Sequence, residues 1–172
     1  MTLRTCLALA FGIIALSVNA NSDAAPANGA AIDASVKSIT DAASRTLTRS
    51  AAYCTSSHLP AGQSLDERLK TYLANMATGS KAAMLEIAAK DSSFVSSSSV
   101  YSPKDLEMMD KQADTMLQNV KAQPAAACSK MGTIFDAGTP AFFKDVTQQG
   151  YQEYVARRAE YCARSPKPAN CK

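Results

Sequence analysis

The chain has four cysteines beyond its first 20 residues, and any pairing among them ties distant segments together: Cys54, Cys128, Cys162 and Cys171. What such cysteines mean depends on the compartment, because thiols stay reduced in the cytosol and pair in oxidising surroundings. The N-terminus of the chain therefore has to be interpreted first.

The first 20 residues have the organisation of a secretory signal peptide. One cation, Arg4, precedes an apolar run, and the sequence Val18-Asn19-Ala20 places small residues where a signal peptidase cleaves. We expect residues 1–20 to be removed together with Cys6, and the mature protein to be secreted, in a bacterium into the periplasm. Beyond this run the sequence has no stretch of roughly 20 apolar residues, so we expect no transmembrane segment in the mature chain.

Four cysteines in an oxidising compartment predict two disulfides. A structural zinc site would need cysteines two to four residues apart, and thiol redox catalysis would need a Cys-x-x-Cys pair; the sequence has neither spacing. Four cysteines allow three pairings, which the sequence alone leaves open. We favour Cys162 with Cys171, because two prolines between them end a helix and turn the tail back, and this leaves Cys54 with Cys128.

The clearest periodicity predicts an amphipathic helix. Apolar residues recur at steps of three and four, which places one apolar stripe on a helix. The stripe consists of Ile32, Val36, Ile39, Ala43, Leu47, Ala51 and Cys54. The polar, proline-bearing segment 21–30 before it predicts a disordered linker.

Further helices are indicated by their start signals. Ser64 to Glu67 has the pattern of a capping box, and Ser102-Pro103 and Thr139-Pro140 each place a capping residue before a proline. A short helix around Cys128 lies between the last two. Gly79 and Ser80 leave open whether the helix after Ser64 is one kinked helix or two, and Gly150 is a candidate close-packing point.

These elements predict an all-α fold, an antiparallel bundle of four to five helices braced by two disulfides. We expect residues 31–172 to form a single helical domain. The six methionines after residue 20 are interpreted mainly as core residues of this bundle, although such side chains can also line an adaptable groove.

The sequence offers few groups for catalysis. Its single histidine, His58, lies in a predicted turn, and no serine-hydrolase, zinc-protease or phosphate-loop motif is present. Carboxylates on shared helix faces are interleaved with Lys and Arg, which is typical of a solvated surface; they are Glu153 and Glu160 on one helix, and Glu107, Asp110 and Asp114 on another. We therefore expect no catalytic residue, no metal and no cofactor.

Charge does not point to nucleic acid. The formal net charge is +3, and the basic residues are scattered apart from a group near the C-terminus. Oligomeric state is not encoded in any pattern that we find.

The segment DSSFVSSSSVYSP is the best candidate for a partner-binding site, because it places apolar side chains in a serine-rich connection. The alternative is that these side chains fold back onto the bundle. They are Phe94, Val95, Val100 and Tyr101.

Two classes of function fit a small, secreted, disulfide-braced bundle without catalytic groups. The first is a protein-binding module of the envelope, such as an inhibitor or an immunity protein that neutralises a toxic enzyme. The second is a carrier that holds a small ligand or lipid in a cavity of the bundle. An apolar cavity would favour the carrier, and a filled core with exposed aromatic side chains would favour the protein binder.

Overall fold

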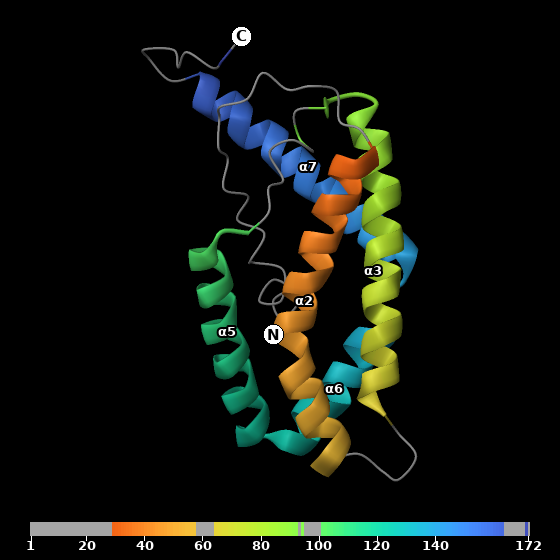
Figure 1. Cartoon of the computed structure of the whole chain (residues 1–172), viewed down its shortest axis with the longest axis vertical. Coiled ribbons are helices and arrows are strands. Elements are labelled where there is room, and N and C mark those ends of the chain that lie inside the picture. Colours follow the sequence, from red (N-terminus) through yellow and green to blue (C-terminus); the bar gives the residue numbers. More distant parts are fainter. Residues whose placement is uncertain (1–28, 58–63, 93, 95–100, 164–170, 172) are drawn as a thin grey trace.

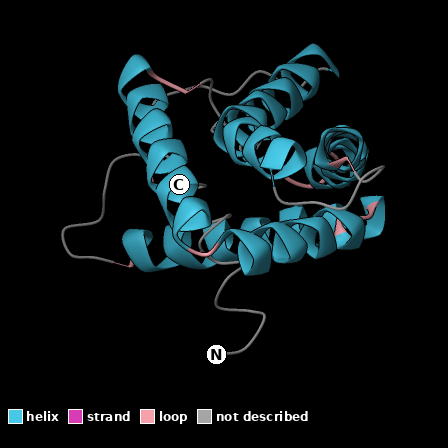
Figure 2. Cartoon of the chain, turned by 90° about the horizontal axis from the view of Figure 1, so that it is seen from below, coloured by secondary structure: helices cyan, strands magenta, loops and turns pink. Residues whose placement is uncertain are grey.

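The computed structural model describes residues 29–57, 64–92, 94, 101–163 and 171. These ranges contain five helices packed together and no strand (Figure 2), which confirms the all-α prediction. The helices are α2 (Gly29–Ser57), α3 (Leu65–Ala88), α5 (Pro103–Ala122), α6 (Pro124–Ala137) and α7 (Pro140–Cys162). None of them combines the length and the apolarity that a membrane span requires.

Of the predicted signal peptide and linker, the structure describes only the last two residues. Residues 1–20 and 21–28 lie outside the described residues, whereas Gly29 and Ala30, which were expected in the linker, belong to α2. The prediction was wrong for these two residues. Ala30 and Ala31 are strong helix formers, so the helix begins before its apolar stripe.

The predicted capping residues begin their helices. Ser102 Oγ accepts a hydrogen bond from the Asp105 amide at 3.3 Å, and the Asp105 carboxylate accepts one from the Ser102 amide at 2.9 Å, which forms a full capping box. Thr139 Oγ1 accepts from the Phe142 amide at 3.2 Å. These contacts satisfy amides that have no partner within the helix.

The long helices alternate in direction along the chain, but α5 does not pack on the helix before it. α2 and α3 are antiparallel neighbours, and α5 lies on the other side of α2 (Figure 1). Arg45 pairs with Asp110 and Arg49 with Asp114, so α5 runs in the same direction as α2. α7 crosses behind α2 and α3, and α6 lies across the lower ends of the bundle (Figure 1).

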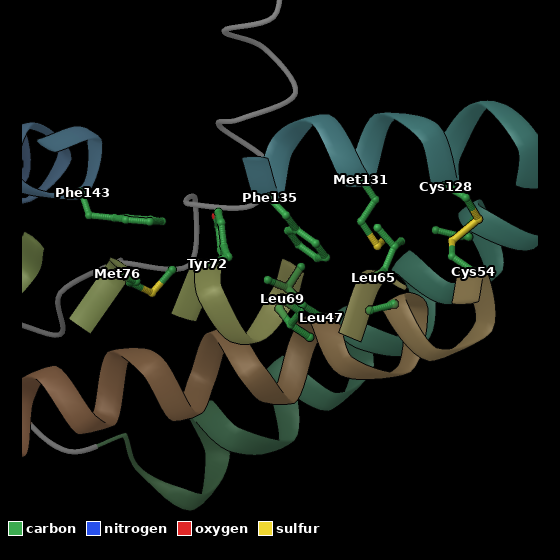
Figure 3. Close-up of a cluster of buried hydrophobic side chains, with 12 residues drawn as sticks. Leu47, Cys54, Leu65, Leu69, Tyr72, Met76, Cys128, Met131, Phe135 and Phe143 are labelled. Atoms are coloured by element: carbon green, nitrogen blue, oxygen red, sulfur yellow. A yellow bond between two sulfur atoms is a disulfide. The ribbon is translucent and has the colours of Figure 1, made fainter. Parts of the chain in front are cut away.

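The apolar side chains form two clusters, one at each end of the α2–α3 pair. The larger cluster joins α2, α3, α5, α6 and the start of α7, and Figure 3 shows most of its side chains. The smaller one joins the start of α2, the end of α3 and the Tyr154 region of α7, and it contains Ile32, Val36, Ala83, Met84, Ile87, Phe94 and Tyr154.

α3 is one continuous helix through Gly79, which answers the question that its sequence left open. A Cβ at Gly79 would lie 2.2 Å from the Pro140 carbonyl oxygen and 2.8 Å from Phe143 Cβ, so this glycine allows the start of α7 to approach the backbone of α3. The expectation for Gly150 was wrong, because a Cβ there would meet nothing within 4 Å. A glycine's packing role depends on the facing helix, which the sequence of its own helix does not specify.

Both favoured disulfides are present. Cys54 pairs with Cys128 and Cys162 with Cys171, with Cα atoms 5.4 and 5.5 Å apart. The first bridge is fully buried in the larger cluster, where it fastens the end of α2 to α6 (Figure 3). A bridge that closes so long a loop stabilises the fold by about 4 kcal/mol in the chain-entropy treatment.

Candidate functional site

Phe94 is a core residue. Its side chain is only 4% exposed, and its ring packs edge-on against Tyr151 and Tyr154, with centroids 5.2 and 5.3 Å away. The expectation that Phe94 anchors a partner on the surface was therefore wrong. Phe94 thus follows the alternative in which its side chain folds back onto the bundle. The reason is that burying an apolar ring among other apolar side chains is more favourable than leaving it in water.

The other three residues of the candidate segment remain incompletely tested. Val95 and Val100 lie outside the described residues. Tyr101 is partly buried, and burial, reinforced by the charge of Asp105, raises the pKa of its hydroxyl. Of the four residues, the structure thus places Phe94 in the core and Tyr101 directly before Ser102, the N-cap of α5.

Four of the five candidate carboxylates form ion pairs. Asp110 and Asp114 pair with arginines of α2, Glu107 pairs with Lys111 at 2.8 Å, and Glu153 lies 3.8 Å from Arg157. The Arg45 guanidinium, which donates to Asp110, holds the pKa of that carboxyl below its ordinary value. A general acid needs a carboxyl whose pKa is raised toward neutrality, so the shift of Asp110 is in the opposite direction.

The described ranges contain no group of three or more His, Cys, Asp or Glu side chains placed to hold a metal ion. His58 lies outside the described residues. Four of the six methionines, Met76, Met84, Met109 and Met131, are buried, while Met108 on α5 is 47% exposed.

A surface depression of about 470 Å³ lies where α5 meets α6. Its lining mixes small side chains with polar ones, namely Asn119, Ala122, Gln123, Ala126, Ala127 and Lys130. A carrier of apolar ligands needs a pocket lined mainly by large apolar or aromatic groups, and this depression does not have such a lining.

The C-terminal part of α7 is the surface that sequence reasoning missed. Every residue from Val155 to Tyr161 is exposed although all are helical, and the end of α7 extends past α2 in Figure 1. Val155 and Tyr161 are 40% and 42% exposed, and Arg157 and Arg158 lie between them. The disulfide from Cys162 to the buried Cys171 fastens the chain directly after this exposed helical segment. We call residues 155–161 the α7 end segment.

A sequence signal for the α7 end segment does exist. Residues 156–160 are Ala-Arg-Arg-Ala-Glu, a window without a large apolar side chain. Of the α7 residues, only Phe143 and Tyr154 are buried.

Comparison with known proteins adds no family to this description. A scan against protein-family models and searches of curated proteins and of solved structures found no match to the chain.

Proposed function

We propose that this protein is a secreted, non-catalytic protein-binding module that occupies the surface of another envelope protein, as an inhibitor or an immunity protein does. The observation that carries the proposal is the α7 end segment, a stretch of helix that is exposed on every residue and is followed at once by a disulfide. Residues 1–20 supply the expectation of secretion to a bacterial periplasm.

Packing on the bundle does not account for the α7 end segment. Most helical stability in proteins comes from burying an apolar face, and an isolated stretch of two turns is unstable in water. Residues 155–161 contain no buried residue, yet the helix continues to Cys162. A helical segment whose residues are all exposed is suited to presenting its side chains to a partner.

The side chains of the segment are of the types that bind proteins. Tyrosine and arginine are enriched at interfaces and among the residues whose truncation costs most affinity. Tyr161 and Val155 offer apolar area. The Arg157 side chain, 74% exposed and 3.8 Å from Glu153, offers donors for carboxylates of a partner. Because Glu153 and Glu160 lie nearby, the surface is mixed in charge, which fits a protein partner better than nucleic acid.

The first experiment is capture from the envelope fraction of the source cell, with the disulfide-bonded protein as bait and mass spectrometry of everything retained. A stoichiometric protein partner, especially a secreted hydrolase, is the expected result. Retained lipid or small molecule without protein would contradict the proposal and favour the carrier.

Substitution then tests the surface. Replacing both Val155 and Tyr161 by alanine should weaken the complex at least tenfold, which corresponds to about 1.4 kcal/mol, because two apolar anchors are removed. The matched control is Met108→Ala, which removes a side chain of similar exposure, 47%, from α5. Equal affinity for the double variant and the wild type, with both folded by circular dichroism, would exclude the α7 end segment as the contact surface.

A further inference from the structure

α5 is held to the bundle by few buried side chains. Of its 20 residues, Met109, Ala113 and Val120 are buried. Val120, near the C-terminal end, belongs to the larger apolar cluster, whereas Met109 and Ala113 belong to neither cluster. In the first two thirds of α5, the buried residues are therefore Met109 and Ala113, and Met116 is partly buried against the larger cluster.

Ion pairs supply much of the remaining contact between α5 and α2. Arg45 Nε and Nη2 donate to the two carboxylate oxygens of Asp110 at 2.6 and 2.7 Å, and Arg49 pairs with Asp114 one turn further on. The side chains of Arg45 and Asp110 are 45% and 33% exposed, and those of Arg49 and Asp114 are 49% and 64% exposed. Water and salt screen pairs of such exposure, so they orient α5 more than they hold it.

The two buried side-chain atoms without a hydrogen-bond partner in the described ranges lie on the same two helices. Ser50 Oγ on α2 and Gln112 Oε1 on α5 have no partner, and Ser50 is 0% exposed. Ser50 lies between Arg49 and Tyr53, whose side chains contact Asp114 and Lys121 of α5. A buried polar atom without a partner destabilises the closed state relative to one in which water reaches it.

The C-terminal end of α5 is fixed differently. Val120 packs into the cluster that contains the Cys54–Cys128 disulfide, and α6 follows after one non-helical residue, Gln123, at φ −141° and ψ 64°. Packing of Val120 therefore holds this end of α5 in the cluster. The Cys54–Cys128 disulfide joins α2 to α6, the helix that follows α5.

We propose that α5 is an opening arm, which separates from α2 over its first two thirds while Val120 and Gln123 act as the hinge. Opening exposes Met109 and Ala113 to water, and the hydration of Ser50 and Gln112 offsets part of that cost. The inference does not depend on the proposed function, since it concerns a surface on other helices than α7.

Hydrogen exchange of the disulfide-bonded protein tests the arm. Once it leaves α2, a helix of this length is only marginally stable in water, so its amides exchange. Amides from Leu106 to Leu117 should exchange roughly a hundredfold faster than those in the middle of α3, and their rates should depend less on urea than global unfolding does. Rates and urea dependence equal to those of α3 would overturn the proposal.

Ser50→Ala provides the second readout, because it deletes the unpartnered hydroxyl without adding volume. It should slow exchange in α5 roughly tenfold and leave α3 unchanged. The control is Ser80→Ala, also buried, whose hydroxyl is hydrogen-bonded to Thr147 Oγ1 at 3.2 Å and which lies between α3 and α7. Exchange in α5 that is the same in Ser50→Ala as in the wild type, or slowed equally by Ser80→Ala, would overturn opening at this surface.

Discussion

The contact of α3 with α7 and the contact of α2 with α5 show two ways in which helices of one small bundle can be joined. In the first, Gly79 lets the backbones approach, and Phe143, 1% exposed, packs edge-on against Tyr72 with ring centroids 5.0 Å apart. In the second, Met109 and Ala113 are the buried residues of α5 beside the exposed ion pairs with α2. The difference teaches that an amphipathic pattern alone does not determine how firmly a helix is held.

Tyr72 illustrates how dry the tight contact is. Burial raises the pKa of its hydroxyl to about 12, because the phenolate cannot be solvated there. Gly138, at the turn before α7, is equally confined, since a Cβ there would lie 2.3 Å from the Tyr72 ring. The contact between α3 and α7 therefore has little room for rearrangement.

The largest expected effect comes from truncating one buried side chain in each of the two contacts and comparing the losses of stability. Phe143→Ala should lower the free energy of unfolding by about 3–5 kcal/mol, because it leaves a cavity in the main cluster. Met109→Ala should lower the free energy of unfolding by less. If α5 opens on its own, the contacts of Met109 cannot contribute more than the free energy that opening α5 requires. Urea denaturation at equilibrium measures both. An equal loss for the two variants would mean that α5 is as firmly packed as α7.

A smaller effect is expected from adding one methyl group at a glycine. Gly79→Ala should destabilise the protein by about 1–3 kcal/mol, because the new Cβ would collide with the Pro140 carbonyl and Phe143. Gly150→Ala is the matched control, and it should stabilise by about 0.4–1 kcal/mol, since it adds helix propensity in open space. A neutral Gly79→Ala would show that the α3–α7 contact is looser than described.

The sequence predicted the helices well where the signals act within a single helix. The Ile32–Cys54 stripe, the capping serines and the prolines at helix starts act locally, and α2, α5 and α7 begin or pack as these signals indicate. The favoured disulfide pairing was also correct.

Predictions from the sequence failed where the environment of a residue depends on a second helix. Phe94 is buried because Tyr151 and Tyr154 lie opposite it, and Gly79 rather than Gly150 faces a backbone. Neither partner is adjacent in sequence, so periodicity within one segment cannot identify it. The α7 end segment was missed for a related reason, since the last buried residue of α7 is Tyr154 and the sequence of α7 does not show which residues other helices cover.

The smallest expected effect compares one carboxylate from each contact. The Lys144 ammonium, which donates to Glu86 at 2.6 Å, lowers the pKa of Glu86 between α3 and α7, as Arg45 lowers that of Asp110 between α2 and α5. A carboxyl whose pKa is lower in the folded than in the unfolded state stabilises the fold above its unfolded pKa, and this stabilisation is lost as pH falls through the folded value. Both contacts should therefore weaken as the pH falls below the ordinary carboxyl pKa toward the lowered folded-state values.

Exchange rates of α5 amides, corrected for the intrinsic effect of pH, distinguish the two carboxylates. Asp110→Asn should remove part of the acid dependence of α5 exchange, whereas Glu86→Gln should leave it intact and reduce only the acid dependence of global unfolding. Arg49 and Asp114 lie beside Asp110, so some acid dependence should persist in Asp110→Asn. If Glu86→Gln altered α5 exchange as much as Asp110→Asn did, α5 would be released only by global unfolding, and the distinction between a tight and a loose contact would fail.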